Sequence, residues 1–372
     1  MNTRMRRAAV AVCATAMAVS LAACGSAKES KDEGDKAAGK KTDALKIGLL
    51  LPENQTARYE KFDKPIIEQQ VKKLTNGKGT IKYLNAKQDA SVQSQQIDTM
   101  ITNKVDVLIL DAVDSKAVAG GVKKAKDADI PVVAYDRLAE GPISAYTSFD
   151  NQEVGKEQGK ALLKALGDKA KPSNSIVMMN GAATDPNAGD FKKGAHSVLD
   201  GKVKVAKEYD TKEWKPENAN TNMEGAISAI GKDKIVGVYS ANDGLAGGII
   251  TALKGAGVSK LPPVTGQDAE LAGVQRIVTG DQYMSVFKSY PQEAETVAKM
   301  AVSIAKTGKL DSSLQTTKVD SGTEKGIPSV IVPIVSLTQD NIKDTVIKEG
   351  YYTVNDICTP KYKKACDKIG LK

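Results

Sequence analysis

Histidine and tryptophan are almost absent from this chain, with one residue of each, and aromatic residues make up only 4% of it. A single His argues against His-based metal sites and against a Ser-His-Asp catalytic triad. Four Cys are too few for a small fold built on disulfides. Because aromatic residues are so few, the hydrophobic core must consist mostly of Ala, Val, Ile and Leu, as is typical of α/β proteins.

Positive charge is present in excess, but it is spread along the chain. The formal net charge is +8, and three of these charges come from Arg4, Arg6 and Arg7 at the N-terminus. No basic cluster is interleaved with aromatic residues, so the sequence argues against a nucleic-acid-binding site.

Residues 1–23 have the pattern of a secretory signal peptide. A basic start is followed by an apolar run from Ala8 to Leu21 that is too short and too rich in Ala to span a bilayer. The run ends in the letters LAAC, which resemble the lipobox of bacterial lipoproteins. We therefore expect Cys24 to become the lipidated first residue of the mature chain. An ordinary signal peptide followed by a chance Cys is the alternative.

The segment after the signal peptide, residues 24–43, is expected to be a flexible tether. Beyond Cys24 it contains no apolar side chain larger than Ala, so burial cannot offset its ordering entropy. No later run of about 18 apolar residues follows. The body is therefore expected to be extracytoplasmic, attached by acyl chains to the outer face of the cytoplasmic membrane. In that oxidising compartment Cys358 and Cys366 are expected to form a disulfide, with a metal site as the alternative.

From Lys46 onward, short apolar runs alternate with amphipathic stretches such as 151–166. Runs typical of buried strands lie at 46–51, 81–84, 105–110, 130–135, 175–180, 203–209, 235–240, 263–266 and 284–287. Strands that alternate with helices predict an α/β fold with parallel sheets covered on both faces. A faint repeat, in which 105–136 resembles 234–268, favours two similar domains, and 372 residues suffice for two of roughly 150 each.

Arginine is scarce in the body of the chain. Of the 53 Lys and Arg residues only six are Arg, and beyond the N-terminal segment only Arg58, Arg137 and Arg276 remain. Arg58 and Arg137 directly follow predicted strands, at the sheet edge where doubly wound folds bind ligands. Because guanidinium offers a planar set of donors that Lys cannot reproduce, we interpret both as ligand-binding residues. Structural ion pairs, such as Arg137 with Asp136, are the alternative. Arg276 falls within a helical pattern and is interpreted as a surface residue.

The single Trp, Trp214, lies in a polar loop between Glu213 and Lys215, which argues against deep burial. A flat indole beside hydrogen-bonding side chains suits a sugar, which has an apolar C–H face and a polar rim. Tyr59 is expected to face the other side of the sugar ring.

Motifs of catalysis are missing from the sequence. It contains no G-x-S-x-G, no H-E-x-x-H and no G-x-G-x-x-G. Nothing distinguishes a catalytic pair among Asp136, Asp243 and Asp268 from acceptors of sugar hydroxyls. The sequence therefore predicts a binding protein that is not an enzyme and that needs neither a cofactor nor a metal ion.

Several sequence blocks, in one order, resemble the periplasmic sugar-binding proteins of ABC importers, most closely the D-xylose-binding and multiple-sugar-binding members. The resemblance runs from about Lys46 to Gly350. The blocks are TARY (56–59), VVAYDR (132–137), YTSFDNQEVG (146–155), DPNA (185–188), WKPENA (214–219), SANDGLAGG (240–248), GQDAELAGVQRI (266–277), SVFK (285–288) and NIKDTVIKEG (341–350).

The resemblance implies the type I periplasmic binding protein fold, in which two Rossmann-like lobes are joined by three crossovers. The crossovers are expected near Phe149, Phe287 and Ser336. The N-terminal lobe is expected to contain residues 44–149 and 288–335, and the C-terminal lobe with the tail residues 150–287 and 336–372.

Block by block, the resemblance also implies the residues that contact the sugar. They are Arg58, Asp136, Arg137, Asn187, Trp214, Asn242, Asp268 and Lys288, with Tyr59 as the aromatic neighbour. Asp136 and Asp268 would accept hydroxyl protons, the cationic side chains would donate, and the two Asn side chains can do both. Members of the D-xylose type tend to carry Arg near Gln55 and Trp at Tyr59, so the identity of the sugar stays open.

We therefore expect a monomeric lipoprotein that captures xylose or a related aldose such as glucose between its lobes. Closure by hinge motion would present the sugar to the permease subunits of an ABC transporter in the membrane. The alternatives are a receptor of the same fold for a nucleoside or signalling molecule, a repressor-type regulator, and a sugar-processing enzyme. A repressor would require an N-terminal helix-turn-helix where the signal segment stands.

Overall fold

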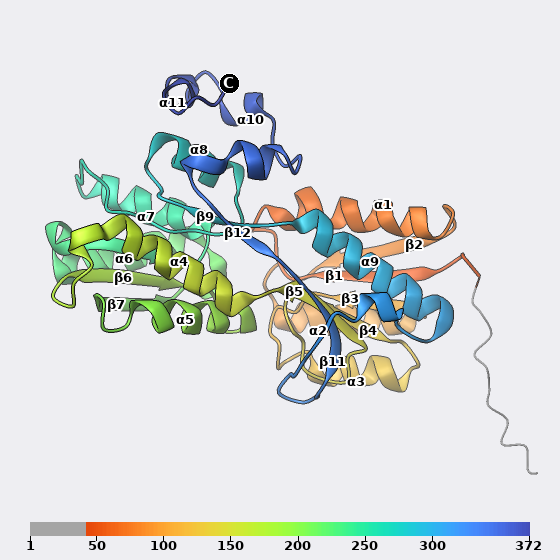
Figure 1. Ribbon diagram of the computed structural model, residues 1–372. Helices are drawn as coiled ribbons and strands as arrows, with labels where there is room; N and C mark the ends of the chain where they lie inside the picture. Colours follow the sequence, from red (N-terminus) through yellow and green to blue (C-terminus); the bar gives the residue numbers. More distant parts are fainter. Residues whose placement is uncertain (1–41) are drawn as a thin grey trace, which may run out of the picture. The chain divides into compact units, whose positions relative to one another are not determined.

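A computed structural model describes residues 42–372 (Figure 1). The predicted signal peptide 1–23, the lipidation site Cys24 and nearly all of the tether 24–43 lie outside the described residues. Among residues 42–372, none of the helices has both the length and the apolar character needed to cross a bilayer.

The strands and helices alternate along most of the described chain. The strands are β1 (Lys46–Leu51), β2 (Thr80–Asn85), β3 (Val107–Leu110), β4 (Val132–Tyr135), β5 (Ala145–Phe149), β6 (Ser175–Asn180), β7 (Lys204–Asp210), β8 (Ile235–Ser240), β9 (Ser285–Lys288), β10 (Thr317–Val319), β11 (Ile327–Val332) and β12 (Ile334–Leu337). The α-helices are α1 (Lys64–Leu74), α2 (Ala90–Thr102), α3 (Ala119–Asp127), α4 (Asn151–Leu166), α5 (Pro186–Leu199), α6 (Pro216–Ile230), α7 (Asp243–Gly255), α8 (Leu271–Thr279), α9 (Tyr290–Thr307), α10 (Val354–Ile357) and α11 (Lys363–Lys368).

Sheet I, as we name it, has the strand order β10-β11-β5-β4-β3-β1-β2. Along β1, Ile47, Leu49 and Leu51 pack in one hydrophobic cluster with α1 and α9, whereas Leu50 packs in another with α2 and α3. This is the alternation of period two expected of a strand buried on both faces. The two pairs of helices accordingly cover opposite faces of sheet I (Figure 1).

Sheet II, as we name it, starts with the strand order β7-β6-β8 and continues through two isolated parallel bridges to β9 and β12. Helix α4 packs on α5, and α6 packs on α7. The first pair is in close contact, since a Cβ at Gly155 would lie 1.9 Å from the carbonyl oxygen of Phe191, and one at Gly194 would lie 2.0 Å from that of Gln152. Larger residues at these glycines would displace α5, whose first turn carries Asn187.

The chain passes between the sheets three times, from β5 into α4, from β9 into α9 and from β11 into β12. The first two passages occur close to Phe149 and Phe287. The third occurs at Pro333, three residues before Ser336, which is already paired with Val286 of β9.

Two features of the sheets differ from the sequence prediction. The run 263–266 is not a regular strand, since Pro263 has no N–H to donate, and only Val264 forms a bridge, to Val238. The sheets are also mixed at their edges, because β10 with β11 and β12 with β9 are antiparallel. β10 and β11 form a hairpin, and β12 continues the direction in which β11 leaves sheet I.

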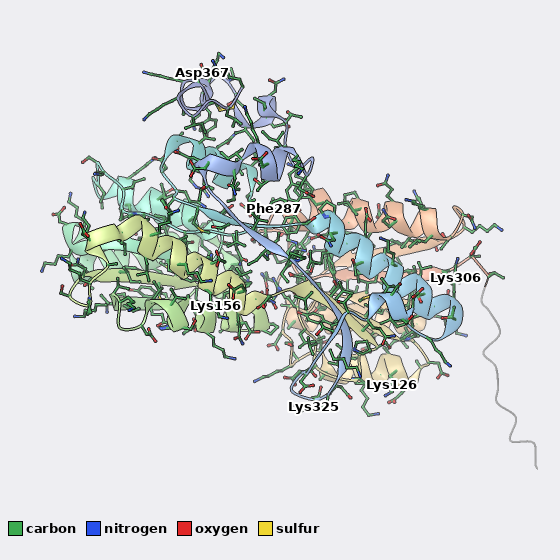
Figure 2. All side chains as sticks on the ribbon, viewed as in Figure 1. Lys126, Lys156, Phe287, Lys306, Lys325 and Asp367 are labelled. Atoms are coloured by element: carbon green, nitrogen blue, oxygen red, sulfur yellow. A yellow bond between two sulfur atoms is a disulfide. The ribbon has the colours of Figure 1, made fainter. Side chains whose placement is uncertain are left out.

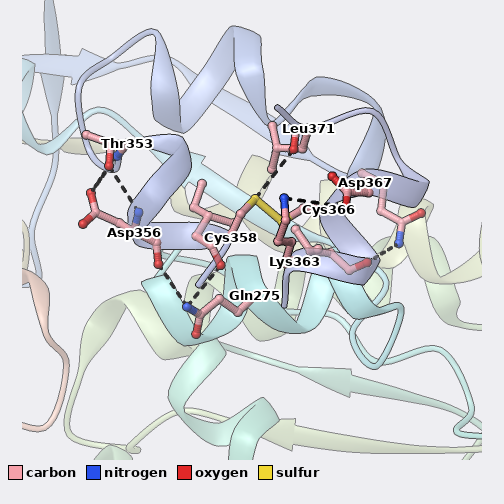
Figure 3. Close-up of a disulfide and its surroundings, with 11 residues drawn as sticks. Gln275, Thr353, Asp356, Cys358, Lys363, Cys366, Asp367 and Leu371 are labelled. Carbon is pink, nitrogen blue, oxygen red and sulfur yellow. Dashed lines mark hydrogen bonds and ion pairs between the residues drawn. A yellow bond between two sulfur atoms is a disulfide. The ribbon is translucent and has the colours of Figure 1, made fainter. Parts of the chain in front are cut away.

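The C-terminal segment after β12 packs on α8 through α10 and α11. Cys358 and Cys366 form a disulfide within it, with an S–S distance of 2.05 Å (Figure 3). Thr353 and Asp356 cap α10 reciprocally, and the side-chain amide of Gln275 on α8 donates to the backbone carbonyl oxygen of Asp356. The segment is thus fixed to the second half of the chain.

Candidate ligand-binding site

A pocket with about 300 Å³ of unoccupied space lies between elements of sheet I and sheet II. All nine residues that the sequence predicts as ligand contacts line it. The lining consists of Thr56, Arg58, Tyr59, Asp136, Arg137, Asp185, Asn187, Phe191, Trp214, Asn242, Gln267, Asp268 and Lys288. The lining is mostly polar.

The pocket residues follow strands, as the rule for doubly wound sheets requires. Arg58 lies between β1 and α1, and Asp136 follows β4 directly. On the other side, Asn242 follows β8 and caps α7, its Oδ1 accepting from the Leu245 N–H at 2.9 Å. Asn187 is in the first turn of α5, and Lys288 ends β9. Parallel strands bring these distant positions to one edge.

Arg58 is held from behind by acidic side chains that the sequence analysis did not single out. Its Nε donates to Asp63 at 2.7 Å, and its Nη2 donates to Glu293 at 2.5 Å. The Tyr135 hydroxyl lies 3.2 Å from the same Nη2. Nη1 makes no hydrogen bond within residues 42–372 and lies 3.3 Å from Asp136 Oδ1 in the pocket. One edge of the guanidinium is therefore fixed and the other faces the pocket.

The carboxyl groups around Arg58 differ in the direction of their pKa shifts. Burial alone would raise the pKa of Asp136, but Arg58, Lys288 and Arg137 hold it below its ordinary value. Burial raises the pKa of Glu293 well above its ordinary value, although Arg58 opposes this. Asp136 is thus kept ionised at the pocket wall, where it can accept hydroxyl protons.

Arg137 joins the two sheets. Its Nε lies 2.9 Å from Asp185 Oδ2, which belongs to the loop before α5, and 3.6 Å from Asp111 Oδ1. Its Nη2 donates to the hydroxyl of Tyr59 at 3.3 Å. The alternative to ligand binding was an ion pair between Arg137 and Asp136. In the structure the ion-pair partners of Arg137 are Asp185 and Asp111. Burial raises the pKa of Asp185, and Arg137 offsets part of that rise.

On the side of sheet II, Lys288 Nζ lies 2.8 Å from Asp268 Oδ1. Both side chains are buried. Asn187 reaches across to the other sheet, its Nδ2 donating to the Asp136 carbonyl oxygen at 3.2 Å. Charged and amide groups from both sheets therefore surround one small volume.

Trp214 is buried, with only 5% of its surface exposed, which contradicts the expectation from its polar neighbours. Its Nε1 donates to Asp185 Oδ2 at 3.1 Å, and Phe191 lies edge-on to it with ring centroids 6.5 Å apart. Glu213 and Lys215 pair with each other at the surface. The sharp turn at 212–214 turns the indole inward and leaves its charged neighbours in solvent.

The backbone is strained at three of the pocket residues. Asp136, Trp214 and Asp268 have φ angles of 55°, 53° and 88°. Such left-handed conformations are uncommon for residues other than Gly and cluster at functional sites. No sequence pattern indicates them, because the surrounding packing enforces them.

Some neighbours of the site were missed or misjudged from the sequence. Asp185 lies within the DPNA block, and its role as the partner of Arg137 and Trp214 depends on tertiary contacts. Asp63 and Glu293 had no signal at all. Arg276 is half-buried and not a free surface residue, since its Nη2 donates to the carbonyl oxygen of Asp243 at 2.5 Å. Lysines such as Lys126 and Lys325 project from the periphery (Figure 2).

The family model described as "Periplasmic binding protein domain" matches residues 47–310. The D-xylose-binding periplasmic protein of Escherichia coli (strain K12) is 35% identical over 84% of this chain and 92% of its own length. The multiple sugar-binding periplasmic protein SbpA of Azospirillum brasilense is 32% identical over 82% of this chain and 89% of its own.

Among solved structures, an ABC transporter solute-binding protein from Clostridium phytofermentans with bound β-D-glucose matches with a TM-score of 0.75 and 28% identity. The match covers 84% of this chain and 99% of that one. These matches and the position of the pocket at the strand ends point to the same family. The chain belongs to the family of periplasmic binding proteins.

Proposed function

We propose that the protein captures a monosaccharide, xylose or a related aldose such as glucose, and delivers it to an ABC permease. The observation that carries the proposal is a set of buried polar atoms on pocket residues that make no hydrogen bond within residues 42–372. They are Arg58 Nη1, Asp136 Oδ1 and Gln267 Oε1, of which the first two lie 3.3 Å apart as an ion pair. Unsatisfied buried groups are costly, and the hydroxyl groups of a sugar would supply both donors and acceptors.

Each hydroxyl of a sugar donates one hydrogen bond and accepts others, which suits the paired charges of the pocket. A hydroxyl between Arg58 and Asp136 would accept from Nη1 and donate to Oδ1, and Lys288 with Asp268 offers a second such pair. Each charge-assisted bond contributes about 1.5–3 kcal/mol. Trp214 and Phe191 provide apolar surface for the C–H face of the sugar ring.

We further propose that the two sheets with their helices are the lobes of a clamp. The N-terminal lobe would contain 44–149 and 289–332, and the C-terminal lobe 150–288 and 334–372, because β9 ends at Lys288 and β12, which pairs with β9, begins after the crossover at Pro333. Contacts such as Arg137 with Asp185 and Asn187 with the Asp136 carbonyl oxygen join the two sides around the pocket. A sugar held by both sides favours the closed state and shifts the population towards it.

The curated relatives named above are sugar-binding periplasmic proteins, which supports binding for transport and not catalysis. We propose that residues 1–23 are a signal peptide and that Cys24 carries lipid, so that a monomer stays at the outer face of the cytoplasmic membrane. Labelling of growing cells with a palmitate analogue would test the anchor. A Cys24→Ser variant that still incorporates label would contradict it.

The sugar proposal is tested by titrating the purified protein with xylose, glucose, galactose, ribose and, as a comparison, adenosine. Trp214 is the only Trp, so its fluorescence reports directly on the pocket. We expect saturable changes in emission and matching heats with at least one aldose, and recovery of the sugar unchanged. No signal with any aldose by either method, or binding of adenosine alone, would refute the proposal.

A further inference from the structure

Tyr351 bridges the backbone where the chain leaves the pocket. Its hydroxyl donates to the Lys288 carbonyl oxygen at 2.7 Å and accepts from the N–H of Tyr290. Ser289, the N-cap residue of α9, makes no side-chain capping bond. The Tyr351 hydroxyl therefore caps the N-terminus of α9, because it accepts a hydrogen bond from a first-turn amide that would otherwise be unpaired. It fixes the point at which β9 becomes α9.

Tyr290, on the other side of this bridge, contacts one proposed sugar-binding residue from each side of the pocket. Its hydroxyl donates to the carbonyl oxygen of Asp268 at 2.9 Å and to Asp268 Oδ1 at 3.0 Å. The guanidinium carbon of Arg58 lies 4.1 Å from the centre of its ring, within the range of a cation–π interaction. A shift of Tyr290 would therefore move both residues.

The rings form a continuous stack across the passage between the sheets. Tyr351 stacks on Phe62 with centroids 4.7 Å apart and on Tyr290 with centroids 5.5 Å apart. Phe62 lies in the helical turn Tyr59–Asp63 that follows Arg58. Tyr351 is 5% exposed and Tyr290 is 1% exposed. The C-terminal segment thus reaches the elements that carry Arg58, Asp268 and Lys288.

We propose that Tyr351 and Tyr290 are positioning residues for sugar binding, which set the geometry of Lys288, Asp268 and Arg58 without touching the sugar. Neither residue lines the pocket. The inference rests on the proposed function and adds that the C-terminal segment, which lies beyond the matched family domain, determines affinity.

The test replaces each phenol by a phenyl ring, which keeps the stack and removes the hydroxyl. Tyr351→Phe is expected to bind the sugar about tenfold more weakly than the wild type, the effect of one lost hydrogen bond. Tyr290→Phe is expected to show a similar loss. Tyr239→Phe is the matched control, because Tyr239 is fully buried and its hydroxyl has no hydrogen-bond partner in the described part of the chain. This control should bind like the wild type.

A double-mutant cycle separates positioning from general destabilisation. If Tyr351 acts through Lys288, Tyr351→Phe should cost little further affinity in a Lys288→Met background. Hydrogen exchange of the ligand-free Tyr351→Phe protein should be faster in the segments 268–270 and 287–290 and unchanged in β8. Unchanged affinity in both Tyr variants, fully additive losses, or unchanged exchange would overturn the inference. Failure of the wild type to bind any sugar would instead refute the proposed function, and the exchange measurement would still decide on positioning.

Discussion

Replacing Arg58 by Lys is the sharpest test of how the pocket works. The guanidinium holds Asp63 and Glu293 on one edge and presents Nη1 beside Asp136 on the other. An ammonium keeps the charge but cannot reach all three carboxyl groups at once, because it is a point charge without the planar fork.

The expected magnitude follows from the contacts that Arg58 makes. Loss of one charge-assisted hydrogen bond to the sugar costs about 1.5–3 kcal/mol, which weakens binding roughly 10- to 150-fold. The free energy of unfolding should also fall, because Asp63 and Glu293 are fully buried and would lose part of the hydrogen bonding and positive charge that Arg58 supplies. Complete removal of a partner from a buried pair costs about 3–5 kcal/mol, so the loss for Lys should lie below that.

Calorimetric titration with the bound sugar measures the affinity, and urea denaturation measures the stability. Arg276→Lys is the matched control, because Arg276 is half-buried and hydrogen-bonded to the Asp243 carbonyl oxygen but does not line the pocket. It should lose stability and keep its affinity. If Arg58→Lys binds within twofold of the wild type, the guanidinium does not hold the sugar and the reasoning fails.

Three further outcomes are expected. Asp185→Asn removes the charge that lies 2.9 Å from Arg137 and joins the two sheets. Because the closed state is then less populated, sugar affinity should fall about tenfold, and X-ray scattering should show a more open ligand-free protein. Unchanged affinity and scattering would contradict this. Reduction of the tail disulfide should lower the free energy of unfolding by about 2–3 kcal/mol, and superimposable urea curves with and without reductant would exclude it. Burial raises the pKa of Asp243 to about 7 and that of Glu270 to about 8. Between about pH 4 and pH 8 the folded state therefore binds more protons at these two carboxyl groups than the unfolded state does. The free energy of unfolding should accordingly fall as the pH rises through this range. Glu270→Gln should flatten this dependence in urea titrations, and equal slopes in both proteins would refute the assignment.

Much of the fold could be predicted because its strands are buried on both faces. The apolar runs 46–51, 175–180 and 235–240 coincide with β1, β6 and β8, and the amphipathic stretch 151–166 coincides with α4. The short strand β5 was not predicted, since AYTSF mixes polar and apolar residues although all five are buried. Strands β10 to β12 were not predicted either. β10 is a three-residue edge strand, and the apolar run shared by β11 and β12 is interrupted by Pro333.

The lining of the pocket could be predicted in part because rare residue types stood out. Arg58 and Arg137 follow strands in a chain otherwise rich in Lys, and Trp214 is the single Trp. The resemblance to a known family added Asp136, Asn187, Asn242, Asp268 and Lys288, whereas Thr56, Asp185, Phe191 and Gln267 also line the pocket and were not predicted. The residues behind them could not be found in this way. Glu293 lies 235 positions from Arg58 in the sequence, and no local pattern marks an acidic residue on an amphipathic helix as the partner of a particular Arg.

The sequence by itself determined that the chain alternates strands and helices, and which polar side chains stand at the strand ends. These properties are local, because periodicity and residue type act over one element. Only the tertiary structure decided the pairing of charges, the inward turn of Trp214, the left-handed backbone at Asp136 and the contact of Tyr351 with the β9–α9 junction. These depend on close approach between segments far apart in the chain, where burial in a medium of low polarity makes each contact strong.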